Sequence, residues 1–254
     1  QGKSSVANGI DVMIALDISK SMLSEDVKPS RLEKAKQLIN QLTDKLQNNR
    51  IGLVVFAGQA YLQMPLTADI TAAKMLIADA SPELVSMQGT NFSDALKLCD
   101  ASLDTKEKKY KSVVLITDGE DQDDKAIESA KQLTENGTVL HTVGVGSAQG
   151  SPIIEPGTNE YKKDANGQTI ISKLNEKLLI DLAAQTNGEY HSLNNAATTA
   201  DEIANALNGM EKKSLAGAGG YIEYKSYYLF FLIIAVALLI TEIFISEKRK
   251  IITI

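Results

Sequence analysis

The sequence predicts an α/β fold, a Rossmann-like, doubly wound and mostly parallel sheet with helices on both faces. Short aliphatic and β-branched runs, such as Val12–Asp17 and Ser112–Thr117, alternate along the chain with amphipathic stretches. These runs are apolar throughout, as is typical of strands that a parallel sheet buries on both faces. A chain of 254 residues is long enough to bury such a core in one domain of about 200 residues.

The expected strands fall into two groups, short edge strands and longer central strands. Two short runs, Tyr61–Met64 and Glu189–Ser192, are expected at the edges of the sheet, which includes one short antiparallel edge strand. Four longer apolar runs are expected to form its buried centre: Val12–Asp17, Ile51–Ala57, Ser112–Thr117 and Val139–Val145.

Apolar residues at helical spacing predict the helices between these strands. Cys99 falls on the core face of one helix with no partner group placed near it, so we expect a structural thiol. As the one cysteine of the chain, it also excludes an intrachain disulfide and a thiolate zinc cage. The helical stretches are Leu32–Leu46, Phe92–Leu103, Ile127–Leu133, Leu178–Ala183 and Ile203–Met210.

Composition shifts divide the remainder of the chain. The stretch Gly146–Lys173 is rich in Gly, Pro, Asn and charge, with a turn signal at Asp164–Gln168, and predicts a hairpin insertion near 147–173. The expected organisation is an N-terminal segment 1–9 whose upstream part is missing, a domain over 10–213, a glycine-rich joint over 214–226, a transmembrane helix over 227–245 and a cytoplasmic tail over 246–254.

The apolar segment Tyr227–Ile245 is interrupted only by Thr241 and Glu242, and as a helix it would span about 28 Å, enough to cross a bilayer. A buried core helix is the alternative. The basic run 248–250 after the segment outweighs Lys225 before it, which favours a cytoplasmic C-terminus. We therefore expect a single-pass protein.

Charge and motifs exclude several classes of function. The net charge is -6 and no basic stripe is present, so nucleic acid is not expected as a partner. No G-x-x-x-x-G-K-[ST] motif occurs, and Gly144–Gly146 leads into the insertion instead of a helix, so a nucleotide site is not supported. His141 and His191 have no acid or nucleophile at catalytic spacing, and we expect both to be structural.

Oxygen-bearing side chains collect where predicted strands end or helices begin, at the sheet edge where open α/β folds bind ligands. Such a set suits a hard cation, Mg²⁺ first, with Mn²⁺ or Ca²⁺ as alternatives. A zinc site of the usual kind is excluded because neither His nor Cys takes part. The five candidate ligands are Asp17, Ser19, Ser21, Thr90 and Asp118.

The set resembles the metal-ion-dependent adhesion site (MIDAS) of von Willebrand factor A (VWA) domains. Asp17, Ser19 and Ser21 match its D-x-S-x-S signature, and Thr90 and Asp118 fall where that family has its Thr and second Asp. The resemblance implies that the three hydroxyls contact the metal and that the two carboxylates act largely through bound water. One coordination position is then left for a carboxylate of a protein partner, and no catalytic group is implied.

Longer runs resemble the Bat (Bacteroides aerotolerance) family: DVMIALDISKSMLSEDVKPSRLEKAK, IGLVVFAGQAYLQMPLT, QGTNFSDAL and the C-terminal apolar segment. The resemblance implies a bacterial inner-membrane protein whose VWA domain faces the periplasm. It also implies partners among homologous VWA membrane proteins, other Bat proteins and a MoxR-type AAA+ ATPase. The hydrophobic N-terminal spans usual in the family are not present in this sequence.

These observations predict a membrane-anchored, metal-dependent binding module for adhesion or assembly. The resemblance to the Bat family implies that it works with the ATPase in stress tolerance or envelope protein assembly. One alternative is a structural membrane scaffold with a vestigial metal site. Another is a metal-dependent hydrolase, for which no general base is identifiable in the site loops. The acids that follow Asp118 either steer a cation or basic partner to the site or favour the next helix through its cap and dipole. These acids are Glu120, Asp121, Asp123 and Asp124.

Overall fold

The computed structural model describes residues 9–47, 49–103, 111–120, 125–155, 157–158 and 160–217. The chain divides into two compact units, Gln1–Gly217 and Ala218–Ile254, and all described residues belong to the first.

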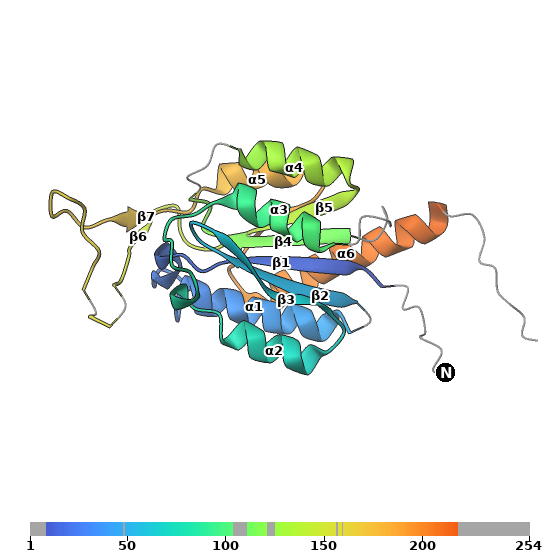
Figure 1. The fold of residues 1–254 in the computed structure, drawn as a ribbon, viewed down its shortest axis with the longest axis horizontal. Helices are drawn as coiled ribbons and strands as arrows, with labels where there is room; N and C mark the ends of the chain where they lie inside the picture. The colour runs from blue at the N-terminus through green and yellow to red at the C-terminus, as the bar shows by residue number, and fades with distance from the viewer. Residues whose placement is uncertain are drawn as a thin grey trace, which may run out of the picture. The chain divides into compact units, whose positions relative to one another are not determined.

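A six-stranded sheet in the order β3-β2-β1-β4-β5-β8 forms the centre of the first unit (Figure 1). Every neighbouring pair is parallel except β2 and β3, so the predicted fold, mostly parallel with one antiparallel edge strand, is confirmed. The strands are β1 (Asp11–Asp17), β2 (Arg50–Phe56), β3 (Ala60–Thr67), β4 (Lys111–Thr117), β5 (Thr138–Gly144) and β8 (Tyr190–Ser192).

Strand β3 is longer than the run Tyr61–Met64 that the pattern predicts. Among its eight residues only Met64 is buried, because β3 pairs with β2 on one side and is an edge of the sheet on the other. An apolar run therefore underestimates the length of this strand.

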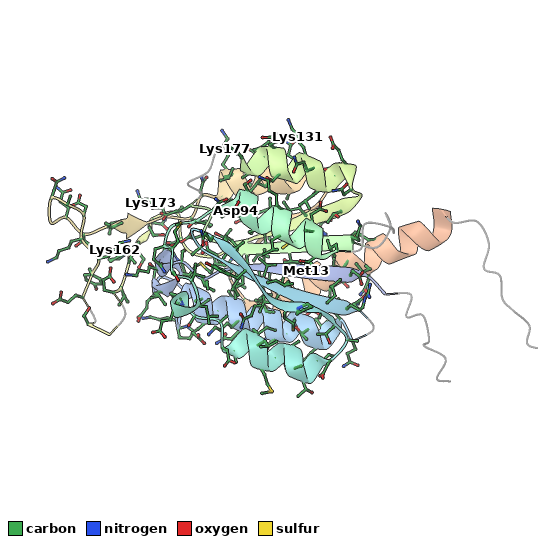
Figure 2. The ribbon with its side chains drawn as sticks, viewed as in Figure 1. Met13, Asp94, Lys131, Lys162, Lys173 and Lys177 are labelled. Carbon is green, nitrogen blue, oxygen red and sulfur yellow. The ribbon has the colours of Figure 1, made fainter. Side chains whose placement is uncertain are left out.

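Three helices cover each face of the sheet (Figure 1). Side chains of β1 alternate between the faces: Ile14 and Leu16 join the core beneath one set of helices, and Met13 and Ala15 join the other core. One face carries α1 (Arg31–Lys45), α2 (Ile70–Ala78) and α6 (Ala196–Gly217), and the other carries α3 (Phe92–Ser102), α4 (Ala126–Glu135) and α5 (Glu176–Ala184). In Figure 2, Lys131 on α4 and Lys177 on α5 point outward, whereas Met13 lies inside the fold.

Helix α2 was not predicted from the sequence. Its nine residues bury only Ala73 and Ile77, too few to establish helical spacing. Asp69 caps its N-terminus, where the side chain accepts hydrogen bonds from the backbone N–H groups of Thr71 and Ala72. Local capping and two buried contacts thus produce a helix that periodicity alone does not reveal.

Side-chain caps also begin two helices near the carboxyl ends of the strands. Ser30 accepts a hydrogen bond from the backbone of Glu33 at the start of α1, and Asn91 accepts one from Asp94 at the start of α3. Two short 3₁₀ helices, η1 (Lys20–Leu23) and η2 (Pro82–Leu84), lie in the loops that precede them. These elements set the positions of the loops that carry the candidate ligands.

Between β5 and α5 the chain forms a second, two-stranded sheet of β6 (Ser151–Pro152) and β7 (Ile171–Ser172). Bridges between Ile154 and Tyr161 and between Lys163 and Thr169 continue the antiparallel pairing outward. Figure 1 shows this segment projecting beyond the ends of the main strands. A hairpin therefore occupies the region where the sequence predicts an insertion.

No helix among the described residues is long and apolar enough to cross a membrane. The predicted transmembrane helix over 227–245 and the tail over 246–254 lie outside the described residues. Helix α6 continues to Gly217, past the predicted domain end at residue 213.

Candidate metal centre

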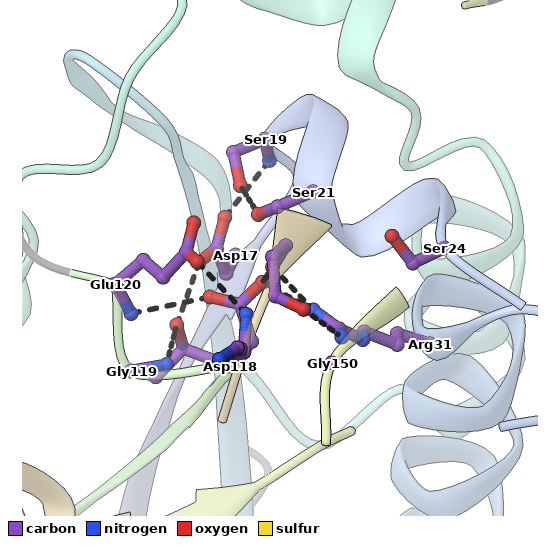
Figure 3. A network of polar contacts seen from close by, with 12 residues as sticks. Asp17, Ser19, Ser21, Ser24, Arg31, Asp118, Gly119, Glu120 and Gly150 are labelled. Atoms are coloured by element: carbon purple, nitrogen blue, oxygen red, sulfur yellow. Dashed lines mark hydrogen bonds and ion pairs between the residues drawn. The ribbon is translucent and has the colours of Figure 1, made fainter. Parts of the chain in front are cut away.

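The centre of the site is the carboxyl end of β1, beside β4. The two strands run parallel with Leu16 opposite Ile116, so Asp17 and Thr117 emerge side by side. Thr117 Oγ1 donates a 2.6 Å hydrogen bond to Asp17 Oδ2, and the backbone N–H of Ser19 donates a 2.8 Å hydrogen bond to Asp17 Oδ1. The completely buried Asp17 carboxylate is therefore held at both oxygens (Figure 3).

The first loop brings its two serines together. Ser19 precedes η1, where the backbone N–H of Met22 donates a 3.0 Å hydrogen bond to the Ser19 carbonyl oxygen. This tight turn places the hydroxyl oxygens of Ser19 and Ser21 3.0 Å apart, and both side chains are buried. Two hydroxyls and one carboxylate thus lie within five consecutive residues, as the D-x-S-x-S spacing predicts.

Asp118 follows β4 directly and is also completely buried. Its Oδ2 accepts hydrogen bonds from Arg31 Nη1 at 2.8 Å and from Ser172 Oγ at 3.2 Å. Its Oδ1 accepts a 3.2 Å hydrogen bond from the backbone N–H of Glu120. The two oxygens of Asp118 are therefore not equivalent, since the guanidinium charge lies against Oδ2.

Thr90 reaches the same edge of the sheet through a separate loop. The backbone N–H of Asn91 donates a 2.9 Å hydrogen bond to the carbonyl of Ala57, which follows β2, the neighbour of β1. Gly89 has a φ of 117°, a conformation that favours glycine, and turns the chain immediately before Thr90. The Thr90 side chain is 5% exposed. All five predicted ligands are thus buried at one edge of the sheet, Asp17 at the end of β1 and the other four in the loops there.

The cluster carries excess negative charge. Burial, and then the nearby Asp118 carboxylate, raise the pKa of Asp17 to about 7. Asp26 and Asp118 both accept hydrogen bonds from the guanidinium of Arg31, and Asp17 lies near enough to Asp118 for their charges to interact. When all of these groups are ionised, the negative charges outnumber the positive charge of Arg31, which favours the binding of a cation.

The donor set fits a hard divalent cation. Two carboxylates and three hydroxyls provide only oxygen ligands. No three His, Cys, Asp or Glu side chains gather as a metal-binding group anywhere in the described part of the chain. Metal binding at this edge would therefore depend on the hydroxyls of Ser19, Ser21 and Thr90 as well as on the carboxylates.

Arg31 and Ser172 were missed by sequence reasoning. Arginine in the first turn of a helix is ordinarily solvent-exposed, and nothing in the local pattern distinguishes Arg31 from such a residue. Ser172 is far along the chain in the hairpin, 141 positions from Arg31, although the two side chains are 2.7 Å apart.

Of the other residues singled out in the sequence, those that the structure describes lie away from the five candidate ligands, except Glu120, which lies beside Asp118. Cys99 is buried, and burial raises the pKa of its thiol, as expected for a structural residue. His141 Nδ1 accepts a 3.3 Å hydrogen bond from the backbone of Glu189, and burial lowers the pKa of His141 to about 4. Glu120 lies beside Asp118, and burial raises the pKa of its carboxyl. The other three acids of that run, at positions 121, 123 and 124, lie outside the described residues.

A family model of the von Willebrand factor type A domain matches residues 12–120. This chain is 42% identical in sequence to the conserved hypothetical protein BatB from Bacteroides thetaiotaomicron, whose crystal structure superposes with a TM-score of 0.77. The match covers 80% of this chain and 100% of the BatB chain. An aerotolerance-related membrane protein from Bacteroides fragilis, crystallised with multiple mutations to serines, is 40% identical with the same coverage and a TM-score of 0.77.

An uncharacterized protein of Borreliella burgdorferi is 25% identical over 252 residues, which are 94% of this chain and 71% of that protein. Two further curated relatives are longer, and the matches span 63% and 26% of their lengths.

A mussel byssus protein, proximal thread matrix protein 1, shares the fold at 18% identity, with a TM-score of 0.53 over 82% of this chain and 46% of that one. That protein was solved with zinc in its MIDAS motif. On the strength of the family model and the two Bacteroides structures, the chain belongs to the von Willebrand factor type A domain family, with the aerotolerance-related BatB protein among its relatives.

Proposed function

We propose that this chain is a divalent-metal-dependent protein-binding module. The metal, Mg²⁺ first with Mn²⁺ or Ca²⁺ as alternatives, is held by Asp17, Ser19, Ser21, Thr90 and Asp118. A carboxylate of the protein partner completes the coordination. The observation that carries this proposal is the buried cluster itself, in which two serine hydroxyls 3.0 Å apart adjoin a carboxylate whose pKa is raised by burial and by a second carboxylate.

The ligand chemistry supports binding of an anionic partner. Serine and threonine hydroxyls are neutral, and the charge of Asp118 is partly offset by Arg31 at 2.8 Å. A dication held by this set keeps much of its positive charge on the side that faces solvent. An external carboxylate is the protein group that pairs best with such a cation.

A hydrolytic role for the same metal has less support. A hydrolase needs a general base within reach of the metal-activated water. Glu120 lies beside Asp118 and outside the ligand set, and its Oε1 accepts a 3.0 Å hydrogen bond from the backbone of Lys173. His141 lies on another part of the sheet, where its Nδ1 accepts a hydrogen bond from the backbone N–H of Glu189. The donor set therefore favours binding over catalysis.

The similarity to BatB supports a more specific proposal. We propose that the module is anchored in the bacterial inner membrane by the segment 227–245, with the VWA domain in the periplasm. There it assembles with homologous VWA membrane proteins, other Bat proteins and a MoxR-type AAA+ ATPase, in stress tolerance or envelope protein assembly. The description of the Bacteroides fragilis relative as a membrane protein is in line with the anchor.

Purification from native membranes tests the metal dependence of partner binding. The full-length chain is captured with its bound proteins, washed with EDTA, and then offered the eluted proteins again with Mg²⁺. We expect release by EDTA and rebinding with Mg²⁺. Asp17→Ala should recover none of these partners, whereas Asp181→Ala, which removes an exposed carboxylate on α5, should behave as wild type. Partners that stay bound in EDTA would argue for the scaffold alternative.

A further inference from the structure

Arg31 is completely buried at the first position of α1, and its guanidinium joins three segments of the chain (Figure 3). Nε and Nη2 each donate a 2.8 Å hydrogen bond to one carboxylate oxygen of Asp26. Nη1 donates to Asp118 Oδ2 at 2.8 Å and to Ser172 Oγ at 2.7 Å, and Nη2 donates to the Ser172 carbonyl at 3.1 Å. All five N–H groups of the guanidinium are therefore engaged.

The position of the Asp118 carboxylate depends on this arrangement. Arg31 and Ser172 together occupy Oδ2, while Oδ1 accepts a hydrogen bond from the backbone of Glu120. The backbone carbonyl of Asp118 also accepts a 2.9 Å hydrogen bond from Asn175, just after the hairpin. A group that holds one oxygen of a metal-site carboxylate orients the other oxygen.

The hairpin insertion, residues 147–173, is tied to the candidate site by further polar contacts. Its first residue, Ser147, donates a backbone hydrogen bond of 2.9 Å to Asp26 Oδ2. Glu155 forms a 2.8 Å ion pair with Lys20, which lies between the two candidate serine ligands. The last residue, Lys173, donates its backbone N–H to Glu120. The insertion thus contacts both loops that carry the candidate aspartates.

These contacts are needed to place the insertion. Its ladder of β6 and β7 pairs two residues in each strand, and a hairpin of that size is not stable alone in water. Gly146 has a φ of +124°, and a Cβ there would lie 2.8 Å from Arg31 Nε, so only glycine lets the chain approach the buried guanidinium. The backbone before the insertion is therefore fitted to Arg31.

We propose that Arg31 is a positioning residue that couples the metal to the hairpin insertion. The bound cation and the docked insertion stabilise each other through Asp118, whose Oδ2 contacts Arg31 and Ser172. This inference rests on the proposed metal site. Because such coupling is reciprocal, a cation that favours the docked insertion is itself bound more tightly when the insertion is docked. The insertion exposes Tyr161 and Ile171, so the metal sets the placement of a surface that a partner meets beside it.

Hydrogen exchange of the full-length chain, in EDTA and in saturating Mg²⁺, tests the coupling, and calorimetry gives the Mg²⁺ affinity. For wild type we expect Mg²⁺ to slow the exchange of backbone amides in the insertion, including those of Ser147 and Lys173. Arg31→Lys keeps the charge but loses the forked geometry, so it should weaken Mg²⁺ binding by about 10-fold or more and remove the metal-dependent protection.

Ser172→Ala is the milder variant, because it removes only the hydroxyl that contacts Asp118 and Arg31. It should reduce both the metal-dependent protection and the Mg²⁺ affinity. Thr158→Ala is the matched control: its hydroxyl donates to the Glu155 carbonyl within the insertion, so the variant should resemble wild type in both measurements. A purely structural role for Arg31 would lower stability in EDTA and Mg²⁺ alike.

Two results would overturn the coupling while leaving the metal site intact. In one, wild type binds Mg²⁺ but its insertion exchanges at the same rate in EDTA and in Mg²⁺. In the other, Ser172→Ala is indistinguishable from Thr158→Ala in exchange and affinity. Wild type that binds no Mg²⁺, Mn²⁺ or Ca²⁺ would instead overturn the metal site and the coupling together.

Discussion

Replacing Asp17 with Asn should stabilise the metal-free domain at alkaline pH while abolishing its response to metal. Without metal, burial and the Asp118 carboxylate raise the pKa of Asp17 from 3.8 to about 7. The folded state therefore keeps a proton that the unfolded chain releases. The stability linked to this proton is fully present below pH 4 and is lost as the pH rises through 7.

The magnitude follows from the size of the shift. About three pKa units at roughly 1.4 kcal/mol each correspond to about 4 kcal/mol by pH 8. Asn removes the charge but presents an amide where both Asp17 oxygens accept hydrogen bonds, from Ser19 N–H and from the Thr117 hydroxyl. The Thr117 hydroxyl can rotate to accept a hydrogen bond from the introduced asparagine amide, but the substitution still lowers the free energy of unfolding somewhat through the changed hydrogen bonds. We expect the stability of Asp17→Asn relative to wild type to rise by about 2–4 kcal/mol between pH 4 and pH 8.

Urea unfolding of the domain ending at Ser214, in EDTA at several pH values, measures this difference. Adding Mg²⁺ at pH 8 should stabilise wild type, because only the native state binds the ion, and should leave Asp17→Asn unchanged. A difference that stays constant from pH 4 to pH 8 would refute the reasoning about buried charge. A metal-induced gain in the variant equal to that of wild type would show that Asp17 is not a ligand.

Three further predictions concern recognition, the buried histidine and the domain boundary. In calorimetry, Thr90→Ala should weaken partner binding more than it weakens Mg²⁺ binding, because the Thr90 loop leads into α3 and can shift that helix when the metal binds. If wild type and Thr90→Ala bind the partner with equal affinity at saturating Mg²⁺, the loop is only a scaffold. The folded domain resists protonation of His141, whose pKa is lowered from 6.5 to about 4, so stability is full above pH 6.5 and falls as the pH drops toward 4. His141→Asn, which keeps an acceptor for the Glu189 N–H, should remove about 2 kcal/mol of the stability loss between pH 7.5 and pH 5 in urea unfolding, and an unchanged loss would contradict the assignment. Cutting the chain after Ser214 should give a soluble, folded domain by gel filtration and circular dichroism; aggregation of that fragment, where the detergent-solubilised full chain is monodisperse, would place the C-terminal apolar segment in the domain core.

Local pattern was sufficient for the central strands and the order of the candidate ligands. Strands buried on both faces must be apolar along their whole length, so runs such as Val12–Asp17 stand out in the sequence. The spacing of Asp17, Ser19 and Ser21 is a property of one short loop, and Asp118 follows its strand directly. Because parallel strands end at a common edge, strand order along the chain already predicted that these groups lie near one another.

The sequence by itself thus determined the α/β class, the identity of the candidate ligands and the sheet edge at which they lie. Only the tertiary structure decided how the site is held together. Arg31 meets Ser172 across 141 positions of the chain, and Lys20 meets Glu155 across 135. Helix α2 and the edge strand β3 likewise depend on packing against neighbours that their own residues do not specify. Periodicity reports how one segment meets the core, whereas a buried arginine or a docked hairpin is stable only when distant segments supply the partners that offset its desolvation.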